Sequence, residues 1–444
     1  MSLALSRLSL LPALTVIIPP GLCYCHECTG KTIMTRATVV GAGIVGLCTA
    51  LYLQNSGRQV TLIDPLPPGA GTSSGNAGII SVGSVHPESM PGIWKEIPEM
   101  LLQSQAPVKL RPGYLLPFTP WLMRFLANSS AERSQRSAAA IHALTSRGLD
   151  YLLPLARQAA ALDLIQQQGS LYVYGRKDQF EKAKRDNAYR ERLGANSEII
   201  EGSELNDVEP CLAPGLAGAI LNPDAGHTVS PLRLSQALFR LFSQQGGEFI
   251  QTRVTHFDRM GNRVTRLEAC GYRATDELFI TAGAYSKELA RLLGSSMLLD
   301  TERGYHLLMP QPGISLRRPV LFPPQAFAAT MMTEGLRLAG TVEFAGLSAA
   351  PDYRRAFDMA VHARTLLPGL EGEGQSPWMG YRPSLPDSLP VISRSPWFNN
   401  VYFGFGHGHL GLTMAAVTGA TLAAMAAGDS PPVDTAPYRI DRKI

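Results

Sequence analysis

The sequence predicts an α/β protein in which a parallel sheet with its helices is combined with a second, mainly antiparallel α+β part. A β-branched run at Thr38–Val40, a glycine-rich turn and a helix-length segment that ends at Gly57 indicate a buried parallel strand followed by its crossover helix. Short hydrophobic segments with turn residues on both sides, such as residues 169–175 and 336–344, indicate strands of the second sheet. Segments of the two kinds alternate, so we expect each part to be assembled from separated stretches of the chain.

The composition is that of an ordinary globular protein, and it excludes several classes. The chain has 444 residues, 45% of them hydrophobic and 17% charged, which suffices for two domains with a sizeable core. A formal net charge of +4, spread without runs of like charge, argues against a nucleic-acid-binding protein. No apolar stretch is expected to reach the roughly 18 residues of a membrane span.

The first residues form an apolar segment that predicts no functional site. Leu8–Pro20 loosely resembles the hydrophobic part of a signal peptide, but only Arg7 precedes it and no A-x-A cleavage site follows. Two consecutive prolines, Pro19 and Pro20, also interrupt the run. We expect Met34 to be the natural start and residues 1–35 to be a disordered extension.

The six cysteines do not form a pattern that predicts a metal or disulfide site. Three of them lie in the extension with one histidine, but a second ligand pair and a C-x-x-C-H haem motif are both missing, so no metal is predicted for Cys23, Cys25, His26 and Cys28. The other three are scattered and are predicted to be reduced core thiols: Cys48, Cys211 and Cys270.

A G-x-G-x-x-G turn between the first strand and helix predicts a site for an adenine dinucleotide. Gly41 permits the tight turn, Gly43 lets the backbone approach a pyrophosphate, and Gly46 lets the helix pack close to the strand. Asp64 ends the next apolar run about twenty residues later, where a carboxylate accepts both ribose hydroxyls. The residues predicted to contact the dinucleotide here are Gly41, Gly43, Ile44, Val45, Gly46, Asp64 and Pro65.

The following segment, T-S-S-G-N-A-G at residues 72–78, suits the close approach of a bulky planar ligand. The alternative is a flexible surface loop, but an apolar strand resumes at once at residues 77–80. With this segment the sequence resembles the glutathione-reductase-type FAD oxidoreductases, within them the amine-oxidising branch, and most of all its bacterial D-amino-acid dehydrogenases. Asp64 is a departure, because many relatives carry Glu there, although Asp still reaches a ribose. The resemblance adds Thr72, Ser73, Ser74, Asn76, Ala77 and Gly78 as FAD contacts.

The resemblance implies a Rossmann-like FAD-binding domain interleaved with a mainly antiparallel α+β substrate domain. The FAD-binding domain is expected to comprise residues 36–88, 226–300 and 386–430, the substrate domain residues 89–225 and 301–385, and a tail residues 431–444. A strand at residues 248–254 and a strand end at residues 278–286 belong to the FAD-binding domain in this family. They imply further cofactor contacts at Val254, Thr281, Ala282 and Gly283.

The middle of the chain predicts several further elements. Residues 90–160 are mostly helical with an interruption at residues 107–120. The stripe of Trp, Leu, Met and Phe at residues 121–126 is either a membrane-surface face, with Lys109, Arg111 and Arg124 beside it, or, as we favour, part of the core or of a domain seam. Residues 177–193 form a charged helix, and Ser230 caps a helix that begins with Pro231. Other segments predict strands: residues 169–175, 218–223, 248–254, 262–270, 272–280, 303–309, 336–344 and 400–405.

The C-terminal third contains the residues predicted to act on a substrate. Residues 378–392 resemble the family segment G-x-R-P…D-x-x-P-x-I, in which Arg382 matches the arginine that binds the substrate carboxylate. A guanidinium group suits this role because it is planar, always charged and able to donate two parallel hydrogen bonds. Tyr305, His306 and Asn76 are further candidates to line the substrate pocket.

A histidine- and glycine-rich turn precedes an alanine-rich helix that is predicted to extend to about residue 427. The N-terminus of this helix is expected to present its amides and positive dipole end to the pyrimidine edge of the flavin, which favours electron uptake. His407 is expected to pack near the ring rather than to act as a base. The implied contacts are Gly406, His407, Gly408, Leu410, Gly411, Leu412 and Thr413.

The resemblance implies FAD-dependent oxidative deamination of D-amino acids, with D-proline or hydroxyproline among the candidate substrates. A hydride passes from the substrate α-carbon to flavin N5 without a dedicated side-chain base, and the products are 2-oxo acids or cyclic imines. No cysteine matches a covalent flavin link, so FAD is expected to be non-covalent. The expected acceptor is a quinone or redox partner, with a cytoplasmic location and peripheral contact at the inner face of the membrane. Two alternatives remain open: an oxygen-using glycine, sarcosine or D-amino-acid oxidase, and the FAD-binding subunit of a multi-protein complex.

Overall fold

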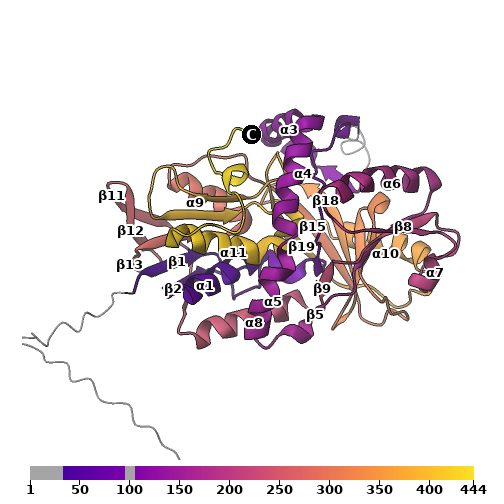
Figure 1. Cartoon of the computed structure of the whole chain (residues 1–444), viewed down its shortest axis with the longest axis horizontal. Helices are drawn as coiled ribbons and strands as arrows, with labels where there is room; N and C mark the ends of the chain where they lie inside the picture. The colour runs from indigo at the N-terminus through magenta and orange to yellow at the C-terminus, as the bar shows by residue number, and fades with distance from the viewer. Residues whose placement is uncertain (1–33, 96–105) are drawn as a thin grey trace, which may run out of the picture. The chain divides into compact units, whose positions relative to one another are not determined.

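The glycine-rich turn follows an inner strand of a six-stranded sheet (Figure 1). The computed structural model describes residues 34–95 and 106–444, so the predicted extension and its cysteine cluster lie outside the described residues. Five strands run parallel in the order β10–β2–β1–β14–β21, and β20 pairs antiparallel at the edge. The strands are β1 (Arg36–Val40), β2 (Gln59–Asp64), β10 (Glu248–Gln251), β14 (Glu277–Ile280), β20 (Val391–Arg394) and β21 (Val401–Phe405).

Both faces of this sheet are covered, because successive side chains of β1 enter different cores. Val39 packs with the helices on one face, and Val40 packs with the elements on the other. The first face carries α1 (Ile44–Asn55), α4 (Ala131–Thr145), α5 (Gly148–Gln158), α8 (Pro231–Gln244) and α11 (Gly411–Ala427). The second carries α9 (Ser286–Leu292) and an antiparallel sheet of β11 (His256–Met260), β12 (Arg263–Glu268) and β13 (Tyr272–Ala274).

The second large sheet has nine strands and is mainly antiparallel. Only the β6–β16 and β4–β18 pairs are parallel among its described strands. Helix α10 (Arg354–Leu366) buries its alanines and Met359 against one face, in a core with Leu307 and Leu338. The strands are β4 (Val108–Leu110), β6 (Ser170–Tyr174), β7 (Glu198–Glu201), β8 (Gly218–Asn222), β15 (Asp300–Met309), β16 (Val320–Phe322), β17 (Phe327–Met332), β18 (Gly335–Phe344) and β19 (Gln375–Ser384).

The remaining elements are short or lie outside the two large sheets. Strands β3 (Ile79–Ile80), β9 (Gly226–Thr228) and β5 (Ile165–Gln166) form a small antiparallel sheet. The described residues also form helices α3 (Leu115–Asn128), α6 (Lys177–Arg192) and α7 (Leu205–Val208), together with short 3₁₀ turns that include η1 (Thr72–Gly75) and η7 (Gly408–Leu410).

The predicted α/β architecture of a parallel sheet joined to a mainly antiparallel sheet is confirmed. Residues 36–64, 248–280 and 391–405 build the six-stranded sheet, and residues 108–222 and 300–384 build the nine-stranded one. Thr35–Ile444 nevertheless pack as one compact unit, so the boundaries proposed for two domains remain a prediction. The segment predicted as a tail packs onto this unit, because Tyr438 is buried and its hydroxyl donates a 2.6 Å hydrogen bond to the carbonyl of Ala140.

Three predictions about elements were wrong in detail. Helix α3 begins at Leu115, within the predicted interruption, because a proline in the first turn of a helix sacrifices no hydrogen bond and Pro117 lies there. The single strand predicted at residues 272–280 is two strands, since β13 joins the antiparallel sheet and β14 joins the parallel sheet. Of the cysteines predicted to be in the core, Cys48 is buried, whereas Cys211 is partly exposed and Cys270 is exposed.

One helix contradicts the expectation that no segment is long enough for a membrane span. Residues Gly408–Ala427 form 20 residues of helix that meet the length and composition of a span. In the structure 67% of the apolar window is buried, and α11 packs against α1 and α5 in the core of the first face. This is the environment of a core helix, and a core helix can have the length and composition of a membrane span.

Candidate functional site

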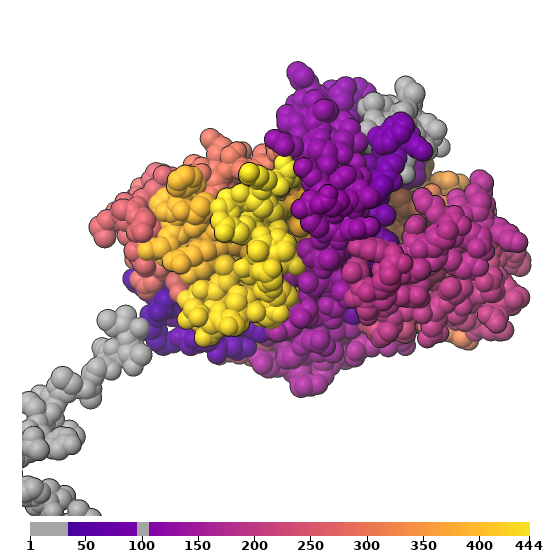
Figure 2. Space-filling view, turned by 45° about the horizontal axis from the view of Figure 1, so that its top comes forward, coloured from indigo at the N-terminus to yellow at the C-terminus, as the bar shows by residue number. Residues whose placement is uncertain are grey.

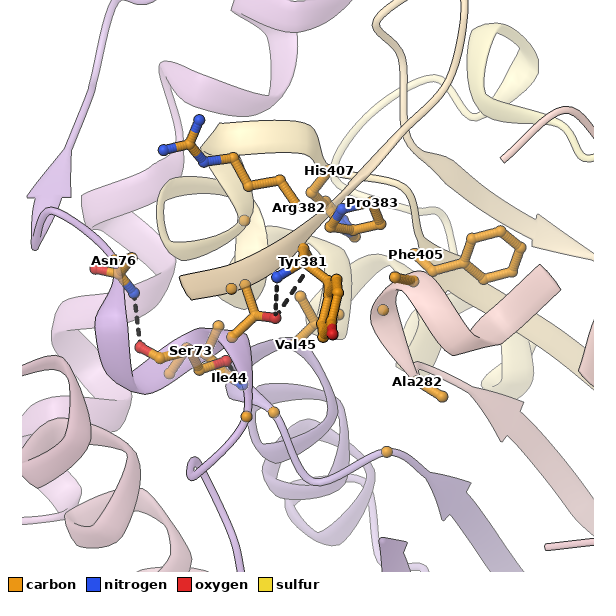
Figure 3. A pocket seen from close by; sticks show the side chains of 18 of the residues that line it. Ile44, Val45, Ser73, Asn76, Ala282, Tyr381, Arg382, Pro383, Phe405 and His407 are labelled. Carbon is orange, nitrogen blue, oxygen red and sulfur yellow. Dashed lines mark hydrogen bonds between the residues drawn. The ribbon is translucent and has the colours of Figure 1, made fainter. Parts of the chain in front are cut away.

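A cavity of about 850 Å³ extends from the glycine-rich turn to the face of strands β15 and β19. Figure 3 shows residues of the glycine turn, of η1, of β19 and of the loop before α11 around this space. Segments more than 300 residues apart therefore meet at one site, since Thr72 in η1 hydrogen-bonds Tyr381 in β19 in both directions, each at 3.1 Å.

The glycine-rich turn has the backbone that a dinucleotide requires. Gly41 adopts a φ of +113°, and a Cβ placed there would lie 2.5 Å from the carbonyl oxygen of Thr281. At Gly46 a Cβ would lie 1.8 Å from the carbonyl oxygen of Gly41, so only glycine lets α1 start this close to the strand. The N-cap of α1 is Gly43, which has no side chain to cap the helix and leaves space at its N-terminus for a phosphate.

Asp64 lies at the end of β2 with its carboxylate fixed by the backbone. One oxygen accepts a 2.8 Å hydrogen bond from the amide of Ala42, and the other accepts a 2.8 Å hydrogen bond from the amide of Leu66. Desolvation raises the pKa of Asp64 against the effect of these two amides. Each oxygen keeps a further lone pair, so the carboxylate suits the two hydroxyls of a ribose.

The turn at residues 72–78 is braced by its own side chains and by a neighbouring arginine. The amide of Asn76 donates to the carbonyl of Ser73 at 2.8 Å, and its oxygen accepts from the amide of Gly78 at 2.7 Å. Arg337 donates to the carbonyls of Ser74 and Asn76. The Asn76 side chain therefore holds the turn in shape, and the hydroxyl of Ser73 accepts from the amide of Ile44 at 3.0 Å.

Two facing glycines of β15 and β19 form an open floor at the other end of the cavity. Gly304 and Gly380 are paired across the two strands, and both line the cavity. A Cβ on Gly380 would lie 2.1 Å from the ring of Trp378, and a Cβ on Gly304 would lie 2.3 Å from a terminal nitrogen of Arg382. The two glycines thus let a flat aromatic ring and a guanidinium group lie against the sheet.

Arg382 is held with part of its hydrogen-bonding capacity unused. One terminal nitrogen donates to the carbonyl of Thr341 at 3.1 Å, and the other donates to the carbonyl of Gly340 at 3.5 Å. Among the described residues no carboxylate lies within 4 Å of its guanidinium group, although the side chain borders the cavity. Desolvation lowers the pKa of Arg382, and the carboxyl groups of Glu302 and Glu88 oppose this, so the group stays cationic.

Of the other two predicted catalytic residues, Tyr305 lines the cavity and His306 does not, and polar atoms of both are engaged by other groups. The Tyr305 hydroxyl donates to Glu343 at 2.7 Å and accepts from the amide of Asp352 at 3.1 Å, within a buried ionic cluster. The His306 ring stacks on Trp378 at 4.9 Å, and its Nδ1 lies 2.8 Å from the carbonyl oxygen of Gly75. Burial lowers the pKa of His306 to about 4. His306 is not among the residues that line the cavity, and its ring supports Trp378; its catalytic role stays a prediction.

The loop before α11 brings two histidines with different surroundings to the site. His407 is buried, and its Nε2 lies 2.9 Å from the hydroxyl of Thr418, which agrees with a packing role. His409 keeps 46% of its side chain exposed and borders the cavity. The turn η7 then leads into α11, whose N-terminus faces the same space through Gly411 and Leu412.

Most of the predicted cofactor contacts line this one cavity: Gly41, Gly43, Ile44, Val45, Asp64, Pro65, Thr72, Ser73, Asn76, Ala77, Val254, Thr281, Ala282, Gly283, His407, Gly408, Gly411 and Leu412. The others are not among the lining residues: Gly46, Ser74, Gly78, Gly406, Leu410 and Thr413. Several of these support the lining, as Thr413 does when its hydroxyl accepts from the amide of Ser81 at 2.9 Å. No cluster of three potential metal ligands occurs in residues 34–95 or 106–444.

Comparison with known proteins assigns this site to a family. The family model described as "DAO: FAD dependent oxidoreductase" matches residues 36–425. The chain belongs to this family. It is therefore an FAD-dependent oxidoreductase, and the glycine turn, Asp64 and the η1 turn are the residues that would hold the FAD.

Individual relatives cover almost the whole chain. A D-amino-acid oxidase of Bradyrhizobium diazoefficiens is 32% identical over 413 residues, which are 91% of this chain and 97% of that protein. A D-amino acid dehydrogenase of Vibrio vulnificus is 31% identical over 406 residues, 89% of this chain and 96% of that protein. The structure of a glycine oxidase from Geobacillus kaustophilus has a TM-score of 0.70 at 19% identity, covering 93% of this chain and 100% of that one, which shows a shared fold.

Sequence reasoning missed several residues of the site. Gly304, Gly380 and Trp378 were not predicted, although glycines inside two strand patterns signal a close approach of another group. Glu302 and His409 were missed as well. His409 could have been predicted as a site residue, since it lies within the histidine- and glycine-rich turn. Nothing in the sequence around Glu302 indicates that this residue belongs to the site.

Proposed function

We propose that this enzyme oxidises D-amino acids to 2-oxo acids, or cyclic D-amino acids such as D-proline or hydroxyproline to imines. The observation that carries the proposal is Arg382, a guanidinium group held by two backbone carbonyls at the edge of the FAD cavity without a carboxylate partner among the described residues. An anion is expected to complete its coordination, and the α-carboxylate of an amino acid matches its geometry. The names of the Bradyrhizobium and Vibrio relatives support the D configuration.

The chain's own residues bind and orient such a substrate. Arg382 takes the carboxylate, and Gly304 and Gly380 let the Arg382 guanidinium group and the Trp378 ring lie against the sheet, at the edge of the cavity that receives the α-carbon. FAD, when bound, supplies the acceptor for the hydride that leaves the α-carbon. Trp378, backed by His306, forms one side of the floor and excludes water from the reacting atoms.

We also propose that electrons pass to a quinone or a redox partner, at a cytoplasmic membrane surface. The support is one face of α3: Leu116 is 84% exposed and Met123 is 61% exposed, next to the cationic Arg124, while Phe118 and Trp121 fill the core on the other side. In Figure 2, where the chain from about residue 107 to 150 is violet, α3 and α4 form a ridge on the surface. An apolar face with a basic flank suits the interface of an anionic bilayer.

Product and acceptor analysis tests the proposal. The purified enzyme is incubated with D- and L-forms of alanine, methionine, phenylalanine and proline, either in air or under nitrogen with a soluble ubiquinone analogue. We expect 2-oxo acid or imine from D-forms, and faster turnover with the quinone than with oxygen. Turnover only in air, with hydrogen peroxide formed in equal amount, would instead identify an oxidase. Turnover restricted to L-forms would refute the substrate assignment.

A further inference from the structure

A buried glutamate next to Arg382 has no hydrogen-bond donor. Glu302 is 1% exposed, and neither of its carboxylate oxygens accepts a hydrogen bond in the described part of the chain. The carboxyl group of Glu88, in the loop after β3, and the hydroxyl group of Ser384 both act on the pKa of Glu302. Desolvation, followed by the charge of Glu88, raises the pKa of Glu302 well above its usual value, which favours its protonated form.

The second carboxyl group of this pair contacts a histidine at the cavity. An oxygen of Glu88 lies 2.9 Å from Nδ1 of His409, whose ring borders the cavity together with Arg382. A carboxylate accepts the hydrogen of Nδ1, which leaves Nε2 of His409 with a free lone pair. Desolvation lowers the pKa of His409, with Arg382 acting in the same direction and Glu302 opposing it, which favours the neutral form of the ring.

We propose that His409 is the base that removes a proton from the substrate ammonium group, with Glu88 orienting it. This inference rests on the proposed function and adds a residue to it. A substrate whose carboxylate is bound to Arg382 has its nitrogen two bonds away from that carboxylate carbon. His409 borders the same end of the cavity, within the electrostatic reach of Arg382.

The proposed step moves one proton and no electrons. An N–H bond of the ammonium group breaks and leaves its electron pair on nitrogen, and the proton forms a new bond to Nε2 of His409. The free amine is then the form from which a hydride leaves the α-carbon. The imidazolium group is stabilised by the Glu88 carboxylate, and it returns its proton to water after the imine has left.

The charged groups around the pair come from three segments of the fold. Arg382 faces Glu302 from β19, Glu88 faces it from the loop after β3, and Asp300 lies two residues away on the same strand. Asp300 is held by the hydroxyl of Tyr114. The alternative is that Glu302 is ionised and serves as the counter-ion of Arg382. In that case Glu302→Gln should cause a large loss in the rate of flavin reduction.

The test is the pH dependence of anaerobic flavin reduction at saturating D-amino acid, using the FAD-loaded full chain. We expect His409→Gln to lower the reduction rate at least about tenfold at pH 7, and the loss to disappear as the pH approaches the pKa of the substrate amine. Glu88→Gln removes the carboxylate and is expected to give the same pattern. Glu302→Gln resembles a neutral carboxyl group and is expected to stay within about threefold of the unaltered enzyme.

Controls separate this role from a structural one and from the proposed function. His256 makes an exposed contact with Asp258 at 3.5 Å on the β11–β12 sheet, so His256→Gln is the matched substitution and should change nothing. The dissociation constant of benzoate, a carboxylate without an amine, is measured from flavin absorbance and should be unchanged in His409→Gln.

A loss of reduction rate in His409→Gln that is equal at all pH values, or no loss at pH 7, overturns the role of His409. A large loss in Glu302→Gln overturns the neutral state of Glu302. Failure of the unaltered enzyme to bleach with any amino acid refutes the proposed function instead.

Discussion

The carboxylate anchor can be removed with little disturbance of the cofactor half of the site. Arg382→Leu replaces the guanidinium group with a shorter apolar side chain and so removes every donor. Two of the five guanidinium donors are already used on Thr341 and Gly340, so the remaining donors can form a pair of hydrogen bonds to a carboxylate. Because each charge-assisted bond is worth about 1.5–3 kcal/mol, the lower limit for the pair is about 3 kcal/mol, or about a hundredfold in kcat/KM.

The assay compares two substrates and three proteins. Flavin reduction is followed for a D-amino acid and for the amine that lacks its carboxylate, in the unaltered enzyme, Arg382→Leu and Arg382→Lys. The lysine variant should be intermediate, since an ammonium group keeps the charge without the two-pronged geometry. FAD absorbance and Tm verify that the variants are folded and loaded. Equal losses for both substrates would refute the assignment of Arg382 as the carboxylate anchor.

Three further predictions follow from the geometry. In Gly304→Ala the new methyl group lies 2.3 Å from the Arg382 guanidinium, so kcat/KM should fall about tenfold while bound FAD is retained; Gly113→Ala, with no atom within 4 Å, is the control. Asp64→Ala should weaken FAD binding, measured by fluorescence of released FAD, by about a factor of ten or more for a lost charge-assisted bond, and undiminished affinity would exclude a ribose contact. Burial lowers the pKa of three histidines, to about 4 at His227, about 4 at His306 and about 3 at His407. The unfolded chain binds protons on these histidines below about pH 6.5 and the folded chain does not, so Tm should fall as the pH decreases from 6.5 toward 4. A Tm that is independent of pH in this range would contradict the lowered pKa values.

The parts of the site that sequence reasoning could find are those encoded locally. The turn of Gly41 and Gly46, the helix after it and Asp64 occupy fewer than thirty residues, and each residue has a physical reason for its place. The strand that ends at Thr281 and the helix after Gly408 were likewise expected from short patterns. Such features can be predicted from the sequence because they depend on local backbone conformation and on neighbouring turns.

The substrate half of the site depends on strand register, which the sequence does not display. Gly304 and Gly380 face each other only because β15 and β19 pair in one register across more than seventy residues. The same register aligns Glu302 with Arg382, and Glu88 arrives from a third segment. Of Tyr305 and His306, which were both predicted to line the pocket, Tyr305 lines it and His306 does not. The Tyr305 hydroxyl is bound to Glu343, and the His306 ring stacks on Trp378.

Anaerobic mixing with the two enantiomers of one amino acid tests the central claim most directly. The FAD-loaded protein is mixed under nitrogen with D-alanine or L-alanine, and the flavin absorbance is followed together with the pyruvate formed. The account predicts complete bleaching with D-alanine and one pyruvate per flavin, with a much slower reaction for the L-form. Bleaching by L-alanine at an equal or higher rate, or no bleaching by any amino acid tested, would contradict it.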